Sequence, residues 1–157
     1  MKIDGSFSIE ASIDRVWSLI TDPKCFAPCV PGCEDIEVLG PEQYQASVKV
    51  SFGPIKTTFV VVFEVVEQEA PVFWKLRVRG EEGGKASSLS ADSEMRLLSL
   101  GPESTEVRYS SEVSVFGRLG KFGAGLMKKH AEKVSQQFAK SFGELARSGA
   151  AAVTSEA

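Results

Sequence analysis

The stretch that decides the fold is residues 118–147, RLGKFGAGLMKKHAEKVSQQFAKSFGELAR. Its apolar residues recur at steps of three and four, the period that places side chains on one side of a helix. They are Met127, Ala131, Val134, Phe138, Phe142 and Leu145, with Leu119, Phe122 and Leu126 extending the stripe toward the amino end. The sequence therefore predicts one long helix, from about Arg118 to Arg147, with an apolar face.

The opposite face of this predicted helix is basic. Residues 117–148 include seven Lys or Arg and two Glu, a net charge of +5, whereas the whole chain carries −3. We expect the contact surface to be formed by Arg118, Lys121, Lys128, Lys129, Lys133 and Lys140. A solvated face, contact with anionic lipid headgroups and docking on an acidic partner protein are the three interpretations. Nucleic acid is a poor candidate because the overall charge is negative.

About a hundred residues of strand-like sequence precede the helix. Alternation in residues 2–10 predicts a first strand, and Ser12 and Asp22 are placed to begin two short helices. Paired Gly and Pro residues then divide the chain into short runs with alternating apolar positions, as a meandering antiparallel sheet requires. The predicted fold class is therefore α+β, with a curved sheet of seven antiparallel strands wrapped around the C-terminal helix. A helix laid in such a concavity often leaves space for a ligand.

The length and composition fit one ordinary domain. The chain has 157 residues, of which 43% are hydrophobic and 25% charged. We assign residues 1–148 to a single domain and expect residues 149–157 to form a disordered tail. No apolar run approaches the roughly 20 residues that span a bilayer, and no secretory signal is visible, so we expect a cytoplasmic location.

Residues that would support catalysis or metal binding are few. The chain has one histidine, His130, so a paired-imidazole metal site is excluded. Cys25, Cys29 and Cys33 superficially suggest a metal site, but three thiols interrupted by two prolines fit small apolar fillers better. We predict no catalytic residues and no metal. His130 is either a boundary residue of the helix or a hydrogen-bond donor to a ligand.

Four glycines occur near the start of the predicted helix, at 117, 120, 123 and 125. Glycine costs about 1 kcal/mol relative to alanine inside a helix, so their presence needs a reason. One interpretation is close packing of helix on sheet with a slow start to the helix. The other is a pliable gate at the mouth of a cavity, flanked by Phe116, Leu119 and Phe122.

The inward-facing positions of the strands and helix give a candidate ligand site. Its polar contact would be Tyr109 or His130, and the rest of the lining is apolar. The predicted lining is Phe59, Phe63, Trp74, Leu76, Tyr109, Phe116, Leu119, Phe122, Leu126, Met127 and His130.

Several motifs resemble a known family. They are Met1-Lys2-Ile3 followed by Gly5-Ser6-Phe7, Val16-Trp17 with Asp22-Pro23, Cys29-Val30-Pro31-Gly32-Cys33-Glu34, Phe52-Gly53-Pro54-Ile55-Lys56, and the glycine-rich segment 80–86. Together they resemble the CoxG family of carbon monoxide dehydrogenase subunits, within the START-like (SRPBCC, helix-grip) superfamily of ligand-binding domains. The resemblance covers residue 1 to about residue 147.

This resemblance implies a helix-grip fold around an apolar cavity, in agreement with the pattern of strands and helices. It also implies a non-enzymatic accessory protein that binds a quinone or similar lipophile and has no tightly bound cofactor. Its partner would be a molybdenum hydroxylase of the carbon monoxide dehydrogenase type. The protein would link that enzyme to its electron acceptor or to the inner face of the cell membrane by peripheral contact.

Two alternatives remain open from the sequence. One is an enzyme of the same fold, a cyclase, dehydratase or hydrolase acting on an aromatic or polyketide-like substrate. It would need ionisable residues that point inward, for example an arginine–carboxylate pair. The other is a pure assembly or recruitment factor, in which Trp74 and Phe138 would fill the space between sheet and helix.

Overall fold

The computed structural model describes residues 2–52, 55–118, 120 and 124–156. The N-terminal part contains strand β1 (Lys2–Ile9), helices α1 (Ile13–Ile20) and α2 (Pro23–Phe26), and a short 3-10 helix, η1 (Ala27–Cys29). Strands β2 (Cys33–Gly40), β3 (Gln43–Phe52), β4 (Ile55–Glu69) and β5 (Phe73–Glu82) follow. A second 3-10 helix, η2 (Gly83–Lys85), then leads into β6 (Ser87–Gly101), β7 (Ser104–Gly117) and helix α3 (Ala124–Glu156).

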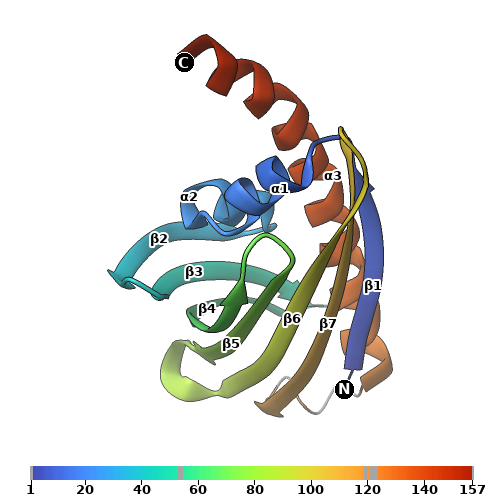
Figure 1. The fold of residues 1–157 in the computed structure, drawn as a ribbon. Coiled ribbons are helices and arrows are strands. Elements are labelled where there is room, and N and C mark those ends of the chain that lie inside the picture. The colour runs from blue at the N-terminus through green and yellow to red at the C-terminus, as the bar shows by residue number, and fades with distance from the viewer. Residues whose placement is uncertain (1, 53–54, 119, 121–123, 157) are drawn as a thin grey trace.

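The seven strands form one antiparallel sheet in the order β1-β7-β6-β5-β4-β3-β2. Strands β2 to β7 are a meander, and β1 pairs with the last strand, so β1 and β2 are the two edges. The segment that joins these edges contains α1 and α2, which lie across one end of the curved sheet, and α3 runs along its inner side (Figure 1). The predicted fold class is therefore confirmed.

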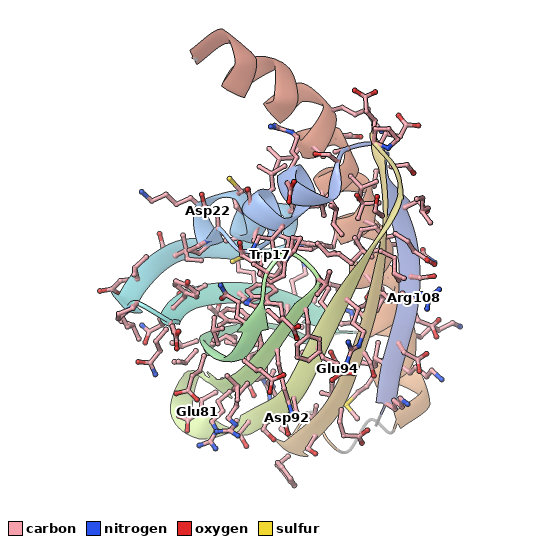
Figure 2. All side chains as sticks on the ribbon, viewed as in Figure 1. Trp17, Asp22, Glu81, Asp92, Glu94 and Arg108 are labelled. Atoms are coloured by element: carbon pink, nitrogen blue, oxygen red, sulfur yellow. The ribbon has the colours of Figure 1, made fainter. Side chains whose placement is uncertain are left out.

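Side-chain caps explain where the two short helices begin. The Ser12 hydroxyl accepts a hydrogen bond from the backbone N–H of Arg15 at 3.3 Å, and the Asp22 carboxylate accepts one from Lys24 N–H at 3.0 Å. Such caps satisfy backbone donors that have no partner within the helix and contribute about 1 kcal/mol each. Figure 2 labels Trp17 on α1 and Asp22 at the start of α2.

The bounds of the long helix differ from those that the sequence predicts. Helix α3 begins at Ala124 rather than near Arg118, because the glycine-rich segment before it disfavours helix. It continues to Glu156, past the end expected near Arg147. The alanines at 150–152 favour helix, and Gly149 alone does not end it.

Two apolar clusters lie at opposite ends of the inner sheet face. The larger one joins β1, α1 and the second half of α3, and its fully buried members include Ile9, Val16, Val107, Phe142 and Ala146. The smaller one is built on Phe59 and Val61 of β4, with Met127 of α3 packed against it. The helix is therefore supported at both ends, and the space between the clusters is where a cavity forms.

Candidate functional site

Two adjoining pockets occupy the space between the sheet and α3. The inner pocket has a volume of about 220 Å³ and lies beside the larger apolar cluster. The outer pocket, of about 570 Å³, extends toward the smaller cluster and the first turns of α3. The residues common to both linings are Val30, Tyr109, Ser111, Val134 and Ser135. The two pockets therefore meet at one junction, formed by β7, α3 and the segment after η1.

The wall of the inner pocket is largely aromatic. Phe26 packs against Trp74 and Phe138, with ring centroids 6.0 and 5.2 Å apart, and Phe7 lies 6.1 Å from Tyr109. These rings come from β1, α2, β5, β7 and α3, so five separate elements fix the shape of the pocket. Trp74 and Phe138 border the open space of this pocket.

The junction carries hydroxyl groups in an otherwise apolar surface. Ser93 of β6 and Ser111 of β7 are directly paired across the strands, and their Oγ atoms lie 2.7 Å apart in a hydrogen bond. Tyr109 lies on the same strand face, and Ser135 faces the sheet from α3. Asp92 and Glu94, which Figure 2 labels, alternate with Ser93 along β6 and are exposed, which leaves Ser93 on the inner face; Glu94 also borders the inner pocket.

Tyr109 owes its position to Gly5, its cross-strand partner on β1. A Cβ atom at residue 5 would lie 2.8 Å from Cζ of the Tyr109 ring, too close for any real side chain. The glycine therefore leaves room for the ring on the inner face of the sheet.

His130 lines the outer pocket, as do Phe59, Met127 and Lys133. Burial lowers the pKa of the His130 imidazole, and the positive charge of Lys133 lowers it further. The imidazole is therefore neutral at pH 7, with one nitrogen that donates and one that accepts. This placement agrees with the expected role of His130 at the cavity, although no ligand contact tests it.

Of the other predicted lining residues, four line the inner pocket, three have side chains outside the described residues, and Phe116 lies elsewhere. Phe63, Trp74, Leu76 and Tyr109 line the inner pocket. Leu119 and Phe122 lie outside the described residues, and Leu126 lies on α3 with a side chain that is also outside them.

Phe116 requires a correction. It is 61% exposed and borders a groove on the other face of the sheet, together with Val60 and Val62. The reason is the period of two along β7: Val113 and Val115 line the outer pocket, so Phe116 must point the opposite way. Phe116 is therefore not part of the cavity.

Arg118 also has a different place from the one expected. Its guanidinium pairs with the carboxylate of Glu82, which is only 3% exposed, and its backbone N–H donates to Ala86 at 2.9 Å. Hydrogen bonds from Arg118, and then from Thr57, lower the pKa of Glu82 to about 2. A buried carboxylate needs such a partner, so Arg118 has a structural role at the end of β7, while its side chain remains 48% exposed.

The remaining basic residues of the predicted contact surface are placed on α3. Lys128, Lys129, Lys133 and Lys140 are exposed, and Lys133 also borders the outer pocket. Lys121 lies outside the described residues. The basic surface of the helix is therefore next to the opening of the larger pocket.

The glycines near the start of α3 have different roles. Gly117 has a φ of +85° and packs against the Ala86 carbonyl, and a Cβ at Gly120 would lie 2.8 Å from the Val115 carbonyl oxygen. Close packing therefore accounts for these two. Nothing lies within 4 Å of a Cβ at Gly125, and Gly123 is outside the described residues.

The sequence prediction missed several lining residues. Phe7 and Ser111 were detectable, because each lies on the apolar face of an alternating strand. Phe26 and Val30 follow from no local pattern, since they reach the pocket only through the path of the chain after α1.

The cysteines do not form a metal site within the described part of the chain, where no group of three potential ligands was found. Cys29 is buried, Cys25 and Cys33 are partly buried, and burial raises the pKa of all three thiols. Likewise, none of the described helices combines the length and apolar character needed to cross a membrane.

An open antiparallel sheet folded around a long C-terminal helix, with an apolar cavity between them, defines the START-like class of domains. The model of the CoxG family, which is named for a subunit of carbon monoxide dehydrogenase, matches residues 5–146. The chain belongs to this family, as its motifs predict. No curated protein sequence matches significantly.

Solved structures support the fold. A conserved protein from Geobacillus kaustophilus superimposes with a TM-score of 0.88 and 24% identity, covering 94% of this chain and 96% of its own. A START superfamily protein from Mycobacterium smegmatis gives a TM-score of 0.75 at 15% identity, with 94% and 97% covered. An aromatase/cyclase from a Streptomyces species gives 0.68 at 16% identity, with 94% and 93% covered. At these identities the comparisons show the fold alone.

Proposed function

We propose that this protein is a non-enzymatic accessory protein that binds a lipophilic small molecule, a quinone, in the cavity between the sheet and α3. The observation that carries the proposal is the pair of adjoining pockets, lined mainly by aliphatic and aromatic side chains. The cavity leaves apolar side chains without packing partners, and an apolar ligand would stabilise the protein by covering them. The volume of the outer pocket suits an isoprenoid or alkyl chain.

A helix substitution at the junction tests this proposal. Val134→Phe places a ring where the pockets meet, whereas Gln136→Phe adds the same ring at an exposed position of α3. Each variant and the wild type would be incubated with an alkyl naphthoquinone, re-isolated, and extracted for mass spectrometry. We expect wild type and Gln136→Phe to retain the quinone and Val134→Phe to lose it. Equal retention by all three, or none by the wild type, would contradict the proposal.

The second part of the proposal concerns partners. The family name associates the chain with carbon monoxide dehydrogenase, and we propose that it serves a molybdenum hydroxylase of that type by carrying its electron acceptor. The exposed lysines of α3 would contact anionic headgroups at the inner face of the membrane, each contributing about 1 kcal/mol near the surface. Because Lys133 borders the outer pocket, its contact with the headgroups would orient the opening of that pocket toward the lipid.

Vesicle sedimentation tests the membrane contact. Lys128→Glu/Lys129→Glu should weaken binding to vesicles containing phosphatidylserine, with no change on purely zwitterionic vesicles. The single reversal Arg79→Glu, at an exposed position on the other face of the sheet, is the control for a charge change away from α3. If the lysine variant binds vesicles normally but no longer co-purifies with the hydroxylase, the basic surface serves the enzyme instead.

An enzymatic role is less well supported, although the structure contains the type of pair that such a role requires. Glu82 lies on the inner face of β5 and pairs with Arg118. However, neither residue lines the two described pockets, and a carboxyl with a pKa of about 2 is a poor proton acceptor at neutral pH. The pair therefore fits a structural role better than catalysis.

A further inference from the structure

We infer that the ligand enters with a hydrogen-bond-accepting ring first, so that its ring lies at the inner pocket and junction while its hydrocarbon chain occupies the outer pocket. This inference rests on the proposed function and adds the orientation and the polar contacts. It follows from where the polar side chains lie within the cavity. The donors at the junction and in the inner pocket are buried or partly buried, whereas four of the polar side chains of the outer pocket, Lys49, Ser51, Lys133 and Gln137, are exposed.

The strongest polar feature is the Ser93–Ser111 pair. Its two hydroxyl groups have two hydrogens, and their mutual bond uses one. The second hydrogen is available to an acceptor on a ligand at the junction. Two serines in the middle of the inner sheet face give little apolar contact, so a polar ligand group is a physical reason for them.

A second donor lies nearby. Trp74 is 5% exposed, and its indole N–H has no hydrogen-bond partner among the described residues. A buried N–H without an acceptor is unfavourable, and native structures rarely leave one unpaired. The indole nitrogen is covered, and the Phe26 ring packs at a steep angle to the indole, so an acceptor reaches the nitrogen only when neighbouring side chains such as Phe26 move.

The register of the sheet brings these groups together. Trp74, Met95, Tyr109 and Gly5 form one row across β5, β6, β7 and β1, and Leu76, Ser93 and Ser111 form the next. Adjacent rows on one face are about 7 Å apart, so the donors of both rows lie within the span of one ring-sized ligand. The hydroxyl of Tyr109 adds a further donor at the junction.

The outer pocket has a different character. Its inner-face lining is mostly aliphatic and aromatic. Its polar side chains beyond the junction are the exposed Lys49, Ser51, Lys133 and Gln137 and the partly buried His130. Its volume is more than twice that of the inner pocket. It suits the long chain of an amphipathic ligand, with the ring placed at the donors. The chemical class is thus a ring with two carbonyl acceptors and an extended hydrocarbon substituent.

Two probes separate this inference from the proposed function. One is a para-naphthoquinone with an alkyl chain, and the other is the corresponding alkylnaphthalene without carbonyl groups. The variant Ser93→Ala/Ser111→Ala should bind the quinone about tenfold more weakly, the effect of one or two lost hydrogen bonds, and the hydrocarbon equally well. Ser90→Ala, at an exposed position of the same strand, is the matched control and should bind both probes normally.

Spectroscopy gives a readout that a merely structural role would not change. The carbonyl stretching band of the bound quinone should lie at lower frequency than in a hydrocarbon solvent and return upward in the double serine variant. Trp74→Phe, which keeps the aromatic packing and removes the donor, should shift one of the bands. In a Trp17→Phe background, the remaining indole fluorescence should be strongly quenched by the bound quinone.

The outcomes are distinct. If the wild type binds neither probe, both the proposed function and this inference fail. If it binds both probes and the serine and Trp74 variants leave affinity and carbonyl bands unchanged, the cavity takes lipophiles but the ring-first orientation is wrong. Weak quenching of Trp74 by a tightly bound quinone would place the ring in the outer pocket and also overturn the inference.

Discussion

The two halves of helix α3 have the same apolar stripe but different surroundings. From Phe142 to Ala146 the helix packs against β1 and α1. Phe142 and Ala146 are completely buried. From Met127 to Gln137 its inward side chains are only partly buried and border the cavity. An apolar stripe therefore identifies the face of a helix that points inward, but not whether that face is packed or faces open space.

The largest effect is expected in the packed half. Phe142→Ala should lower the free energy of unfolding by about 3–5 kcal/mol, because it leaves a void in the larger cluster. Met127→Ala, at the edge of the outer pocket, should cost only about 1 kcal/mol because the site already adjoins open space. Chemical denaturation of both variants measures the difference. Equal losses would mean that the two halves are equally packed.

The next effect concerns the junction between packed and open regions. Gly5→Ala should displace the Tyr109 ring and lower the free energy of unfolding by about 1–3 kcal/mol through overpacking. Quinone retention should fall as well, because the ring borders both pockets. Gly40→Ala, where a Cβ meets nothing within 4 Å, is the control. Normal quinone retention in Gly5→Ala would show that Tyr109 does not shape the junction.

We predict that Glu82 makes the stability of the protein sensitive to acid. Its pKa is about 2 in the folded protein and 4.5 in a free side chain, so its stabilisation is complete above pH 4.5 and is lost as the pH falls toward 2. Glu82→Gln should therefore lower stability at neutral pH and flatten the pH dependence in this window. Glu81→Gln, its exposed neighbour with the same charge change, should do neither. Matching acid unfolding curves for the two variants would remove Glu82 as the cause.

The smallest effects are expected from two glycines of α3. Gly143→Ala should raise stability by about 0.5–1 kcal/mol, because its Cβ would meet Ile9 at an ordinary 3.7 Å. Gly125→Ala also has room, and a pliable entrance predicts slower quinone uptake at unchanged final retention. Stopped-flow uptake measures this, with Gly143→Ala as control. Unchanged uptake in Gly125→Ala would assign that glycine no role in entry.

Alternation explains which parts of the site were predictable. The inward positions of β4, β5 and β7 place Phe59, Phe63, Trp74, Leu76 and Tyr109 at the cavity, as the sequence predicts. The same rule excludes Phe116, whose place in the prediction came from its closeness in sequence to the helix. Phe26 and Val30 were not predictable, because their contacts depend on how the chain crosses from β1 to β2.

Charge patterns were informative only in part. The sequence places the lysines of α3 on one side, and the structure leaves four of them exposed. The sequence gives no indication that Arg118, which follows β7, pairs with Glu82 of β5. Long-range pairing of this kind depends on the sheet register, which no local pattern specifies.

The sequence by itself determined the α+β fold, the inward face of each element and the membership of the CoxG family, because these depend on period, turn residues and motifs. Only the tertiary structure decided that α3 is packed at one end and open at the other. It also decided which hydroxyl groups meet at the junction. The physical reason is that a cavity is a property of several elements at once, set by how closely the helix can approach a curved sheet.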